Sequence, residues 1–344
     1  MNLQEFRKEF DVHFSAFVKR KVKEYKNLAK DKETREFFTH LETYVKGGKR
    51  LRPYAAFMAF SESGKQISEK EWLVFISLEL VHVLALIHDD IIDRALDRRG
   101  IDTIHTFIEK NTPIVRGDKK HFSNSQAILV GDIIFAASFQ ALRESQTSAD
   151  VQYKIHQLLD EVIIGQMIDV NLAHGDFSTR AQIMTKSKYK TALYTFSRPF
   201  EVGALLGGIS EKKQHDLYTI GEMLGVSYQL QDDYLDIFDT KNTLQKELLN
   251  DMKEGQQTLI TYHILKQANE DQKKTFLKYF GKNFSIKDSK KIIKLITDLQ
   301  IDTICEREIL SLFEKTKRLV QNSSLSDTTQ QYIINLVSLL EARM

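Results

Sequence analysis

Two short segments of this 344-residue chain each carry three aspartates at helical spacing. One reads HDDIID from His88 to Asp93, and the other reads QDDYLD from Gln231 to Asp236. The first and last aspartates of each segment are four residues apart, so they are neighbours on one helix face and repel each other. Both segments also end long apolar stretches, where the negative end of the helix dipole adds to that repulsion.

A bound cation would offset this repulsion. Carboxylate oxygens without His or Cys favour Mg²⁺, which keeps its waters and bridges protein carboxylates to substrate phosphates. A single acidic triplet is usually a solvated helix end, but two matching triplets in a chain of net charge +2 favour a metal site. The predicted metal ligands are six aspartates: Asp89, Asp90, Asp93, Asp232, Asp233 and Asp236.

Basic residues stand where a phosphate group would bind. In the segment GGKRLRP, residues 47–53, glycines end one expected helix and basic side chains open the next. A helix N-terminus with cations beside it is a natural anion site. Arg98 and Arg99 begin five residues after Asp93, within reach of a ligand on that metal cluster. The alternative interpretations are an ordinary glycine cap and an arginine pair that only neutralises the acidic helix end.

The elements that must position these residues are helices. Only 3 prolines and 15 glycines occur in the chain, too few for the many turns of an all-β fold. Ser68 and Glu71 form a capping-box pattern, and the helix that starts there should run to about Asp93. A second long helix should cover Glu211–Phe238. Further helices are expected near residues 5–29, 51–63, 122–145, 149–173, 179–208, 256–280, 286–299, 302–321 and 326–343.

Two interruptions of this helical pattern are expected. Pro199 removes a hydrogen bond within the 179–208 helix and should bend it. Residues 110–124 are polar and have no clear period, which predicts a surface loop. No Gly/Ser-rich or Pro-rich linker divides the chain, and this favours one large helical domain over residues 1–344.

The composition excludes several classes of protein. The chain has 49 Lys and Arg against 47 Asp and Glu, which gives no reason to expect a nucleic-acid partner. The charged N-terminus does not have the pattern of a secretory signal, and no run of about 18 apolar residues predicts a transmembrane span. The one cysteine, Cys305, cannot form an internal disulfide, which fits a reducing cytoplasmic compartment.

Taken together, the motifs resemble the trans-isoprenyl diphosphate synthase (polyprenyl synthetase) family, in particular its farnesyl and geranylgeranyl diphosphate synthases. The resemblance rests on GGKRLRP at 47–53, ELVHVLALIHDDIIDRALDRRG at 79–100, AILVGD at 127–132, GQMID at 165–169, YKTA at 189–192 and YQLQDDYLD at 228–236. It implies an all-α helical bundle of the isoprenoid synthase type around a central cavity, usually as a homodimer. Members condense isopentenyl diphosphate with an allylic diphosphate and release pyrophosphate.

The resemblance also implies a role for individual residues. The two aspartate triplets would hold about three Mg²⁺ ions on the allylic diphosphate, which Arg98 would also meet. Four residues would hold isopentenyl diphosphate: Lys49, Arg52, His82 and Arg99. Four more would face the allylic leaving group and the developing cation: Lys190, Thr191, Gln229 and Lys246.

The chemistry fits these residue types. Ionising an allylic C–O bond requires a stabilised pyrophosphate leaving group, which metal ions and basic side chains supply electrostatically. The isopentenyl double bond then attacks the cation, so no protein nucleophile is needed, and pyrophosphate is the usual base for the last proton. Below the first aspartates, Val81, Leu84 and Ala85 form an apolar wall for the growing tail. A leucine at position 84 predicts short to medium products, C15–C20.

One departure from the family pattern concerns a basic residue. After the second triplet the family typically reads GKxxGxDxxxGKxT, and this chain keeps Lys246 and Asp251 but has Gln256 where a diphosphate lysine is expected. Losing one charged contact to phosphate weakens binding by about 1.5–3 kcal/mol if nothing compensates. Lys253, one helical turn earlier, is a candidate substitute.

Two alternative functions share the fold. A terpene cyclase would typically lack GGKRLRP and RRG, because it binds no isopentenyl diphosphate, and its second motif is usually of an Asn/Ser/Glu type. A non-catalytic subunit of a heteromeric synthase commonly loses aspartates from the motifs, whereas all six are present here. Both comparisons favour the elongating synthase.

Overall fold

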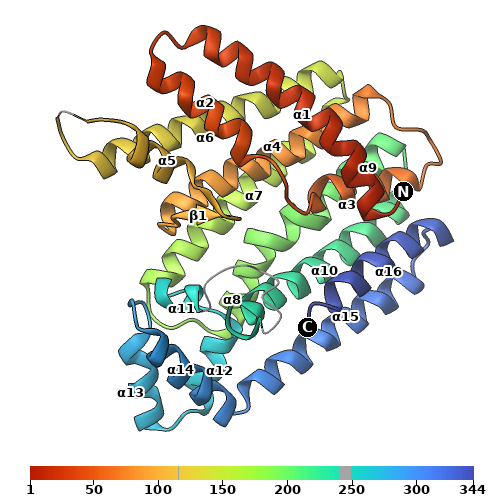
Figure 1. The fold of residues 1–344 in the computed structure, drawn as a ribbon. Coiled ribbons are helices and arrows are strands. Elements are labelled where there is room, and N and C mark those ends of the chain that lie inside the picture. Colours follow the sequence, from red (N-terminus) through yellow and green to blue (C-terminus); the bar gives the residue numbers. More distant parts are fainter. Residues whose placement is uncertain (115, 240–248) are drawn as a thin grey trace. The chain divides into compact units, whose positions relative to one another are not determined.

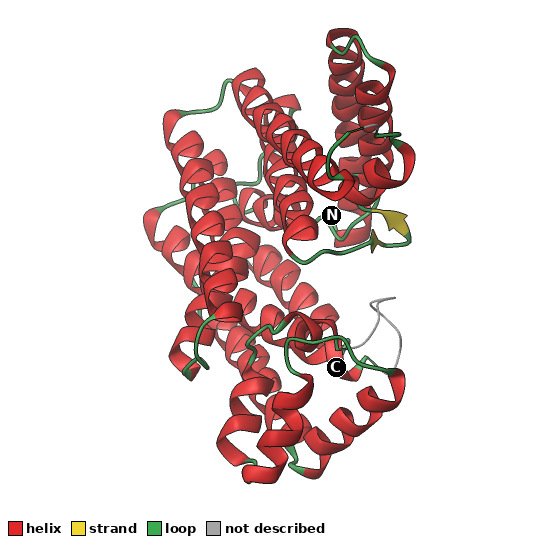
Figure 2. Ribbon diagram, turned by 90° about the vertical axis from the view of Figure 1, so that its left-hand side faces the viewer, coloured by secondary structure: helices red, strands yellow, loops and turns green. Residues whose placement is uncertain are grey.

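The computed structural model describes residues 1–114, 116–239 and 249–344, and these are almost entirely helical (Figures 1 and 2). The strands among them are one short hairpin, in which β1 (Asp97–Arg98) pairs with β2 (Ile101–Asp102). The predicted all-α class is therefore confirmed. Lys246 lies outside the described residues.

Two compact units divide the chain. The first unit comprises residues 1–57 and 65–152, and the second comprises residues 58–64 and 153–344. Each unit contains one of the two aspartate triplets. The single domain over residues 1–344 stays a prediction.

Six helices lie wholly or mainly in the first unit: α1 (Leu3–Leu28), α2 (Lys32–Tyr44), α3 (Leu51–Ser61, which ends in the second unit), α4 (Glu69–Ile92), α5 (Ile104–Asn111) and α6 (Lys119–Ser145). The central element is α4, which packs along α6, while α1 packs against α2 (Figure 1). The predicted start of α4 is confirmed, because the Glu71 carboxylate accepts a hydrogen bond from the Ser68 backbone N–H at 2.8 Å. Most side chains of α4 are buried, so this helix carries its terminal aspartates on a rigid core element.

The second unit contains the remaining helices: α7 (Ala149–His174, of which the first residues belong to the first unit), α8 (Arg180–Ser187), the π-helix η1 (Lys188–Ser197), α9 (Arg198–Gly207), α10 (Glu211–Phe238), α11 (Asn250–Glu254), α12 (Leu259–Gln267), α13 (Glu270–Tyr279), α14 (Ile286–Asp298), α15 (Ile301–Gln321) and α16 (Asp327–Glu341). The central element here is α10, which packs against η1, α9 and α15. The second aspartate triplet lies near the C-terminal end of α10.

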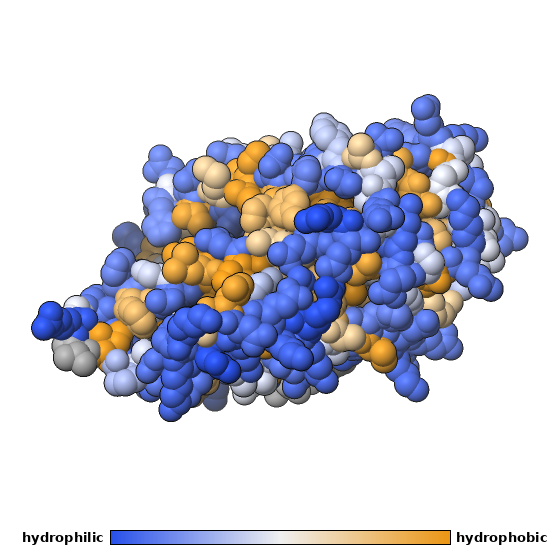
Figure 3. Space-filling view, turned by 90° about the horizontal axis from the view of Figure 1, so that it is seen from above, coloured by the Kyte–Doolittle hydropathy of each residue, from blue (hydrophilic) through white to orange (hydrophobic). Residues whose placement is uncertain are grey.

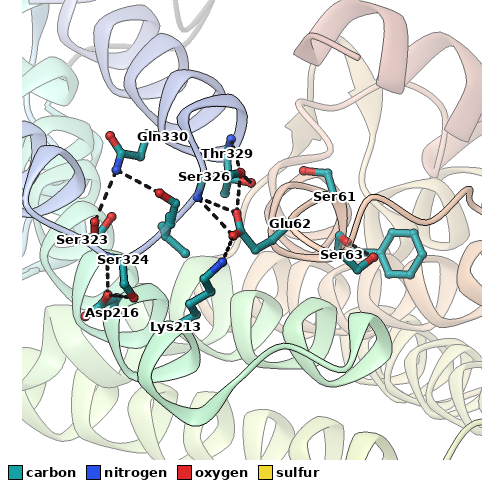
Figure 4. Close-up of polar contacts among 12 residues, drawn as sticks. Ser61, Glu62, Ser63, Lys213, Asp216, Ser323, Ser324, Ser326, Thr329 and Gln330 are labelled. Carbon is teal, nitrogen blue, oxygen red and sulfur yellow. Dashed lines mark hydrogen bonds and ion pairs between the residues drawn. The ribbon is translucent and has the colours of Figure 1, made fainter.

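A polar network ties residues 58–64 to the rest of the second unit (Figure 4). The Glu62 carboxylate forms an ion pair with Lys213 of α10. It also accepts hydrogen bonds from the Ser326 backbone N–H and hydroxyl, the latter at 2.7 Å, at the N-terminus of α16. This buried carboxylate therefore satisfies donors of two helices that are far apart in the sequence.

The helix expected over residues 179–208 is divided into α8, η1 and α9. Pro199 lies at the second residue of α9, directly after the ten π-helical residues of η1, and the bend expected at Pro199 stays a prediction. The Arg198 N–H bonds the carbonyl of Leu193, five residues back. The hydrophobic pattern runs without a break through this region and so did not reveal the change of helix type.

Other predicted boundaries need correction. The helix expected over 256–280 is two helices, α12 and α13, because the Asn269 side chain caps a new start. The loop expected over 110–124 is shorter, since α6 begins at Lys119 with Asp118 as its N-cap. The helix expected to end at the glycines of residues 47–48 is α2, and two short helices, α5 and α11, were not predicted.

Two helices, α4 and α6, are long and apolar enough to cross a membrane, which is weak evidence because core helices of soluble proteins pass the same test. The apolar window of α4 is 72% buried, as expected for a core helix, whereas that of α6 is 44% buried. The exposed part of α6 includes Ile128 and Leu129. The face seen in Figure 3 is mostly hydrophilic and carries separate hydrophobic patches.

Candidate active site

The first aspartate triplet divides into two kinds of carboxylate. Asp89 and Asp93 are partly exposed and lie one turn apart at the end of α4, where the Asp93 N–H bonds the Asp89 carbonyl at 2.8 Å. Asp90 is buried, and its carboxylate accepts hydrogen bonds from the Tyr44 hydroxyl at 2.6 Å and from Arg98 Nε at 2.8 Å. Asp89 and Asp93 are thus presented at the surface, while Asp90 is held by the protein.

The β1–β2 hairpin brings the predicted arginine pair back to α4. Its turn residues Arg99 and Gly100 both have positive φ, 58° and 74°, the backbone of a tight hairpin turn. Arg98 reaches Asp90, with 2.5 Å between Nη2 and Oδ1. Burial opposes the charge of Arg98, but the negative charge of Asp90 raises the pKa of the arginine, so the two form an ion pair.

Positive charge gathers around His82, one of the predicted isopentenyl diphosphate ligands. Desolvation, followed by the charges of Arg52, Arg98 and Arg99, holds the pKa of His82 well below its usual value. Arg52 is buried, whereas Lys49 is exposed. The structure therefore places His82 and the three arginines in one electrostatic cluster, a setting that an anion would stabilise.

The second of the two glycines before this basic segment, Gly48, makes room for an arginine. Gly48 has a φ of +104°, and a Cβ added there would lie 3.2 Å from Arg99 Nη1. Arg99 therefore lies directly over the glycine loop. Two motifs that are about fifty residues apart in the sequence, GGKRLRP and RRG, meet at this point.

Arg50, which lies between the predicted ligands of GGKRLRP, has a structural role. It is buried, and it forms ion pairs with Glu79 of α4 at 2.6 Å and with Asp11 of α1 at 2.8 Å. Its guanidinium also lies over the Phe14 ring, 4.6 Å from the centroid. Arg50 therefore holds the GGKRLRP segment against α1 and α4, and it does not face a ligand.

The second triplet also presents one carboxylate more openly than the others. Asp232 has a side chain that is 39% exposed, and its Oδ1 lies 3.4 Å from Nη2 of Arg343 near the C-terminus. Asp233 is buried and accepts a hydrogen bond from Gln229 Nε2 at 2.6 Å. Asp236 accepts backbone N–H groups at the start of α11, of which that of Asp251 is at 3.1 Å.

The π-helix places two predicted catalytic residues beside this triplet. The Thr191 hydroxyl donates to the Gln229 carbonyl oxygen, and the amide of Gln229 in turn donates to Asp233. Lys190 forms an ion pair with Asp169 of α7, with 2.5 Å between Nζ and Oδ2. Within the second unit the structure therefore brings Lys190, Thr191 and Gln229 together with the aspartates of α10.

Three glycines allow the wide turns of η1. A Cβ on Gly221 of α10 would lie 2.7 Å from Ser197 Cα. A Cβ on Gly165 of α7 or on Gly225 of α10 would come closer still to backbone atoms of η1. Real Cβ atoms essentially never approach backbone so closely, so the neighbouring helices pack against η1 only because these positions are glycine.

Three charged residues near the second triplet were not predicted as site residues. Asp169, quoted above only as part of GQMID, and Lys186 are both buried and lie 3.1 Å apart. Asp251 is partly exposed and lies near the aspartates of α10, and desolvation together with the charges of Asp236 and Asp233 raises its pKa well above the usual value. Nothing in the sequence distinguishes Lys186, because a lysine one helical turn before Lys190 is expected to be an ordinary surface residue.

The structure shows the surroundings of the predicted apolar wall of α4 and of Gln256, which stands where the family pattern has a lysine. Val81 and Leu84 are buried in α4, and Ala85 is partly exposed. Gln256 lines a small cavity together with Asp233 and Asp251. Lys253 contacts the Phe284 ring, with Nζ 5.7 Å from the centroid.

The donor set of both triplets fits Mg²⁺. In the described part of the chain, no three His, Cys, Asp or Glu side chains form a ready-made metal site. The partly exposed carboxylates Asp89, Asp93 and Asp232 offer oxygen ligands only. Mg²⁺ binds through one or two carboxylates, keeps several waters and uses substrate phosphates as further ligands. Such a metal needs no closed protein cage.

The fold, with a carboxylate-tipped core helix in each unit and basic groups beside both, is that of an all-α prenyl-diphosphate-binding protein of the isoprenoid synthase type. The family model for polyprenyl synthetase matches residues 34–296. The chain belongs to this family.

Relatives and a solved structure agree with this assignment. The chain is 28% identical over 287 residues to the short chain isoprenyl diphosphate synthase of Methanocaldococcus jannaschii, a match that covers 82% of this chain and 83% of that protein. It is 29% identical over 285 residues to the geranylgeranyl diphosphate synthase of Saccharolobus solfataricus, covering 79% of each. The structure of a geranylgeranyl pyrophosphate synthase from Corynebacterium glutamicum, complexed with isoprenyl diphosphate and magnesium, matches with a TM-score of 0.91 at 26% identity and covers 100% of both chains.

Proposed function

We propose that this protein is a trans-prenyltransferase that condenses isopentenyl diphosphate with an allylic diphosphate, namely dimethylallyl, geranyl or farnesyl diphosphate. The observation that carries the proposal is the arrangement at the end of α4. There Asp89 and Asp93 are partly exposed, and His82 of the same helix lies in one electrostatic cluster with Arg98 and Arg99 of the hairpin and with Arg52 of α3. Carboxylates for a metal and cations for a second anion thus occur together in the first unit, as a reaction between two diphosphates requires.

Magnesium binding would fall to the carboxylates that the protein leaves exposed. Asp89, Asp93 and Asp232 would hold about three Mg²⁺ ions, which neutralise negative charge on the departing pyrophosphate. Asp90, Asp233 and Asp236 would support these ligands from behind, because their side chains are buried. Their carboxylates accept hydrogen bonds from Tyr44 and Arg98, from Gln229, and from the N–H groups of α11. This division of labour is our proposal for the six predicted ligands.

The residues of η1 would act at the allylic carbon. Lys190 and Arg98 would stabilise the leaving pyrophosphate with positive charge, and Lys246 would add to it. Gln229 donates its amide to Asp233, which fixes the direction of its carbonyl oxygen. That oxygen and Thr191 Oγ1 would stabilise the developing allylic cation through their partial negative charge.

Isopentenyl diphosphate would be held by Lys49, Arg52, His82 and Arg99. The lowered pKa of His82 keeps its imidazole neutral at pH 7, so it would donate a hydrogen bond to the diphosphate without adding charge. In the reaction the allylic C–O bond would break first and pyrophosphate would leave, and the isopentenyl double bond would then attack the allylic cation to form the new C–C bond. The released pyrophosphate would accept the proton that is lost when the new double bond forms.

Product length would be limited at the apolar wall of α4. Leu84 is buried one turn below the aspartates and should hinder the hydrocarbon tail without closing its path, which favours C15–C20 products. Leu84→Phe should shorten the product distribution and Leu84→Ala should lengthen it, as measured by mass spectrometry of the dephosphorylated products. An unchanged distribution in both variants would place the limit on another helix.

Quaternary structure and compartment are further parts of the proposal. The exposed apolar side chains of α6, Ile128 and Leu129, would be covered by a second copy of the chain, giving a homodimer. In the second unit, Ile163 and Met167 of α7 are exposed as well. Cys305 is a buried thiol, in keeping with a reducing cytoplasmic compartment.

Incubating purified protein with Mg²⁺, isopentenyl diphosphate and each allylic starter in turn tests the proposed function. Linear prenyl diphosphates that are longer than the starter are expected. A cyclic hydrocarbon formed from the allylic diphosphate alone would favour the terpene cyclase alternative. Activity that appears only after a second, different subunit is added would favour the heteromeric one.

A further inference from the structure

Several carboxylates lie close together in the described part of the second unit. Asp233 and Asp251 are desolvated and lie within electrostatic range of each other. The charges of Asp236 and Asp232 also act on Asp251. Buried carboxylates so close together need a fixed positive charge nearby.

Lys186, in the last turn of α8, brings such a charge. Its side chain is only 6% exposed, and its Nζ lies 3.1 Å from Asp169 Oδ1 and 2.9 Å from the backbone carbonyl of Gln257. The positive charge of Lys186 also acts on Asp233 and Asp251, where it opposes the effect of burial. This lysine therefore joins Asp169 of α7 to the backbone of Gln257, the residue that follows Gln256.

The position of Lys186 is fixed by its acceptors. The side chain of Gln257 is itself held in place, because its Nε2 donates to the carbonyl of Asp176 at 3.1 Å and its Oε1 accepts the Ser178 N–H at 2.6 Å. The Gln257 carbonyl is thus a rigid anchor for the ammonium group. Asp169 is shared, with one oxygen bonded to Lys186 and the other bonded to Lys190.

This sharing couples Lys186 to a residue of the proposed active site. With Lys186 in place, the charge of Asp169 is divided between two lysines. Without it, Asp169 would keep Lys190 alone of its two lysine partners among the described residues, and it would compete more strongly with a diphosphate for the ammonium group of Lys190.

A cavity next to this group shows where a second cation would fit. Gln256 Oε1 and Asp233 Oδ2 are buried atoms with no hydrogen-bond partner among the described residues, and both side chains line the same small cavity with Asp251. Position 256 is the one where the family pattern places a lysine. A lysine at position 256 would place its charge near Asp233 and Asp251, the carboxylates on which the charge of Lys186 also acts.

We propose that Lys186 is a positioning residue for the prenyl transfer, which supplies the positive charge that this chain lacks at position 256. Its ammonium group holds Asp169 and the second aspartate cluster in the arrangement that accepts Mg²⁺ and diphosphate, and it leaves Lys190 available to that diphosphate. The identity of the ligand in this inference rests on the proposed function, whereas the arrangement of charges does not.

The test measures binding and does not depend on turnover. Full-length protein is titrated with inorganic pyrophosphate at fixed Mg²⁺, and the dissociation constant and the thermal midpoint are recorded. Lys186→Met should weaken Mg²⁺–pyrophosphate binding by about tenfold, the scale of one lost charged contact. Lys186→Arg should bind nearly as wild type does, and Gln256→Lys in the Lys186→Met background should recover most of the lost affinity.

The matched control is Lys188→Met, two residues further along the chain, where a partly exposed lysine pairs with Glu222 at 2.8 Å. This variant should bind Mg²⁺–pyrophosphate as wild type does. Wild-type affinity in Lys186→Met, or no recovery in the double variant, would overturn the proposal and leave Lys186 a structural ion pair. Failure of the proposed function is a separate result, because it would show as wild-type protein that binds Mg²⁺–pyrophosphate but elongates no allylic diphosphate.

Discussion

At the scale of single residues, the two aspartate triplets are less alike than their sequences suggest. Helical spacing correctly identified which carboxylates share a face, because i and i+4 residues are neighbours on any helix. It did not identify Asp90 as a buried partner of Tyr44 and Arg98, since those residues come from α2 and from the hairpin. The spacing of residues shows which of them share a helix face. The residues that contact this face depend on how distant segments of the chain pack.

This difference predicts opposite phenotypes for neighbouring aspartates. Asp89→Ala should lower turnover by at least about two orders of magnitude, the scale of losing one preorganised electrostatic element, with little change in stability. Asp90→Ala should lower the free energy of unfolding by about 3 kcal/mol, because it leaves Arg98 without its buried partner. Steady-state kinetics and urea unfolding of the two variants, side by side, provide the measurement. Equal effects on turnover and stability in both variants would contradict the assignment.

At the scale of elements, the long helices were predictable and the change of helix type was not. The capping box at Ser68 and the continuous apolar pattern correctly predicted α4 almost to its last residue. No pattern within residues 179–208 distinguishes a π-helix from an α-helix, because the cause lies on other helices. In the sequence, nothing distinguishes Gly165, Gly221 and Gly225 from other glycines in helices. The need for glycine at these positions is seen only in their close contacts with η1.

Gly225 offers a direct test of this explanation. The Cβ of Gly225→Ala would overlap the backbone of Ala192, so η1 must shift and the Thr191–Gln229 hydrogen bond should weaken. We expect a loss of about 1–3 kcal/mol in stability and a larger fractional loss of kcat than of substrate affinity. Gly207→Ala is the control, because its Cβ would meet only side-chain atoms, the nearest at 3.1 Å. A Gly225→Ala enzyme as active and stable as that control would show that η1 does not need this glycine.

At the scale of the whole molecule, the all-α class followed from the scarcity of proline and glycine, and the family followed from six motifs in order. The surface of α6 adds information that the motifs do not contain. Ile128 and Leu129 are 45% and 55% exposed on a helix whose apolar window is less than half buried. A monomer would leave these side chains in water, which favours association with a second copy.

A charge on this face should therefore break the proposed homodimer. Leu129→Lys should shift the protein from dimer to monomer in sedimentation equilibrium, because burying an unpaired ammonium group costs several kcal/mol. Leu28→Lys, at a leucine that is 75% exposed at the end of α1, is the matched control and should leave the mass unchanged. A dimer that persists in Leu129→Lys would place the interface elsewhere.

The central claim is that Mg²⁺ and two diphosphate substrates act together on this protein, and an omission assay measures it most directly. Purified protein receives Mg²⁺, isopentenyl diphosphate and geranyl diphosphate, and then each mixture that lacks one of the three or contains excess chelator. Pyrophosphate release and the mass of the organic product are followed together. The account predicts one pyrophosphate per added isoprene unit and a linear C15–C20 prenyl diphosphate in the complete mixture, with neither in any incomplete one. Elongated product in excess chelator, or pyrophosphate release without isopentenyl diphosphate, would contradict it.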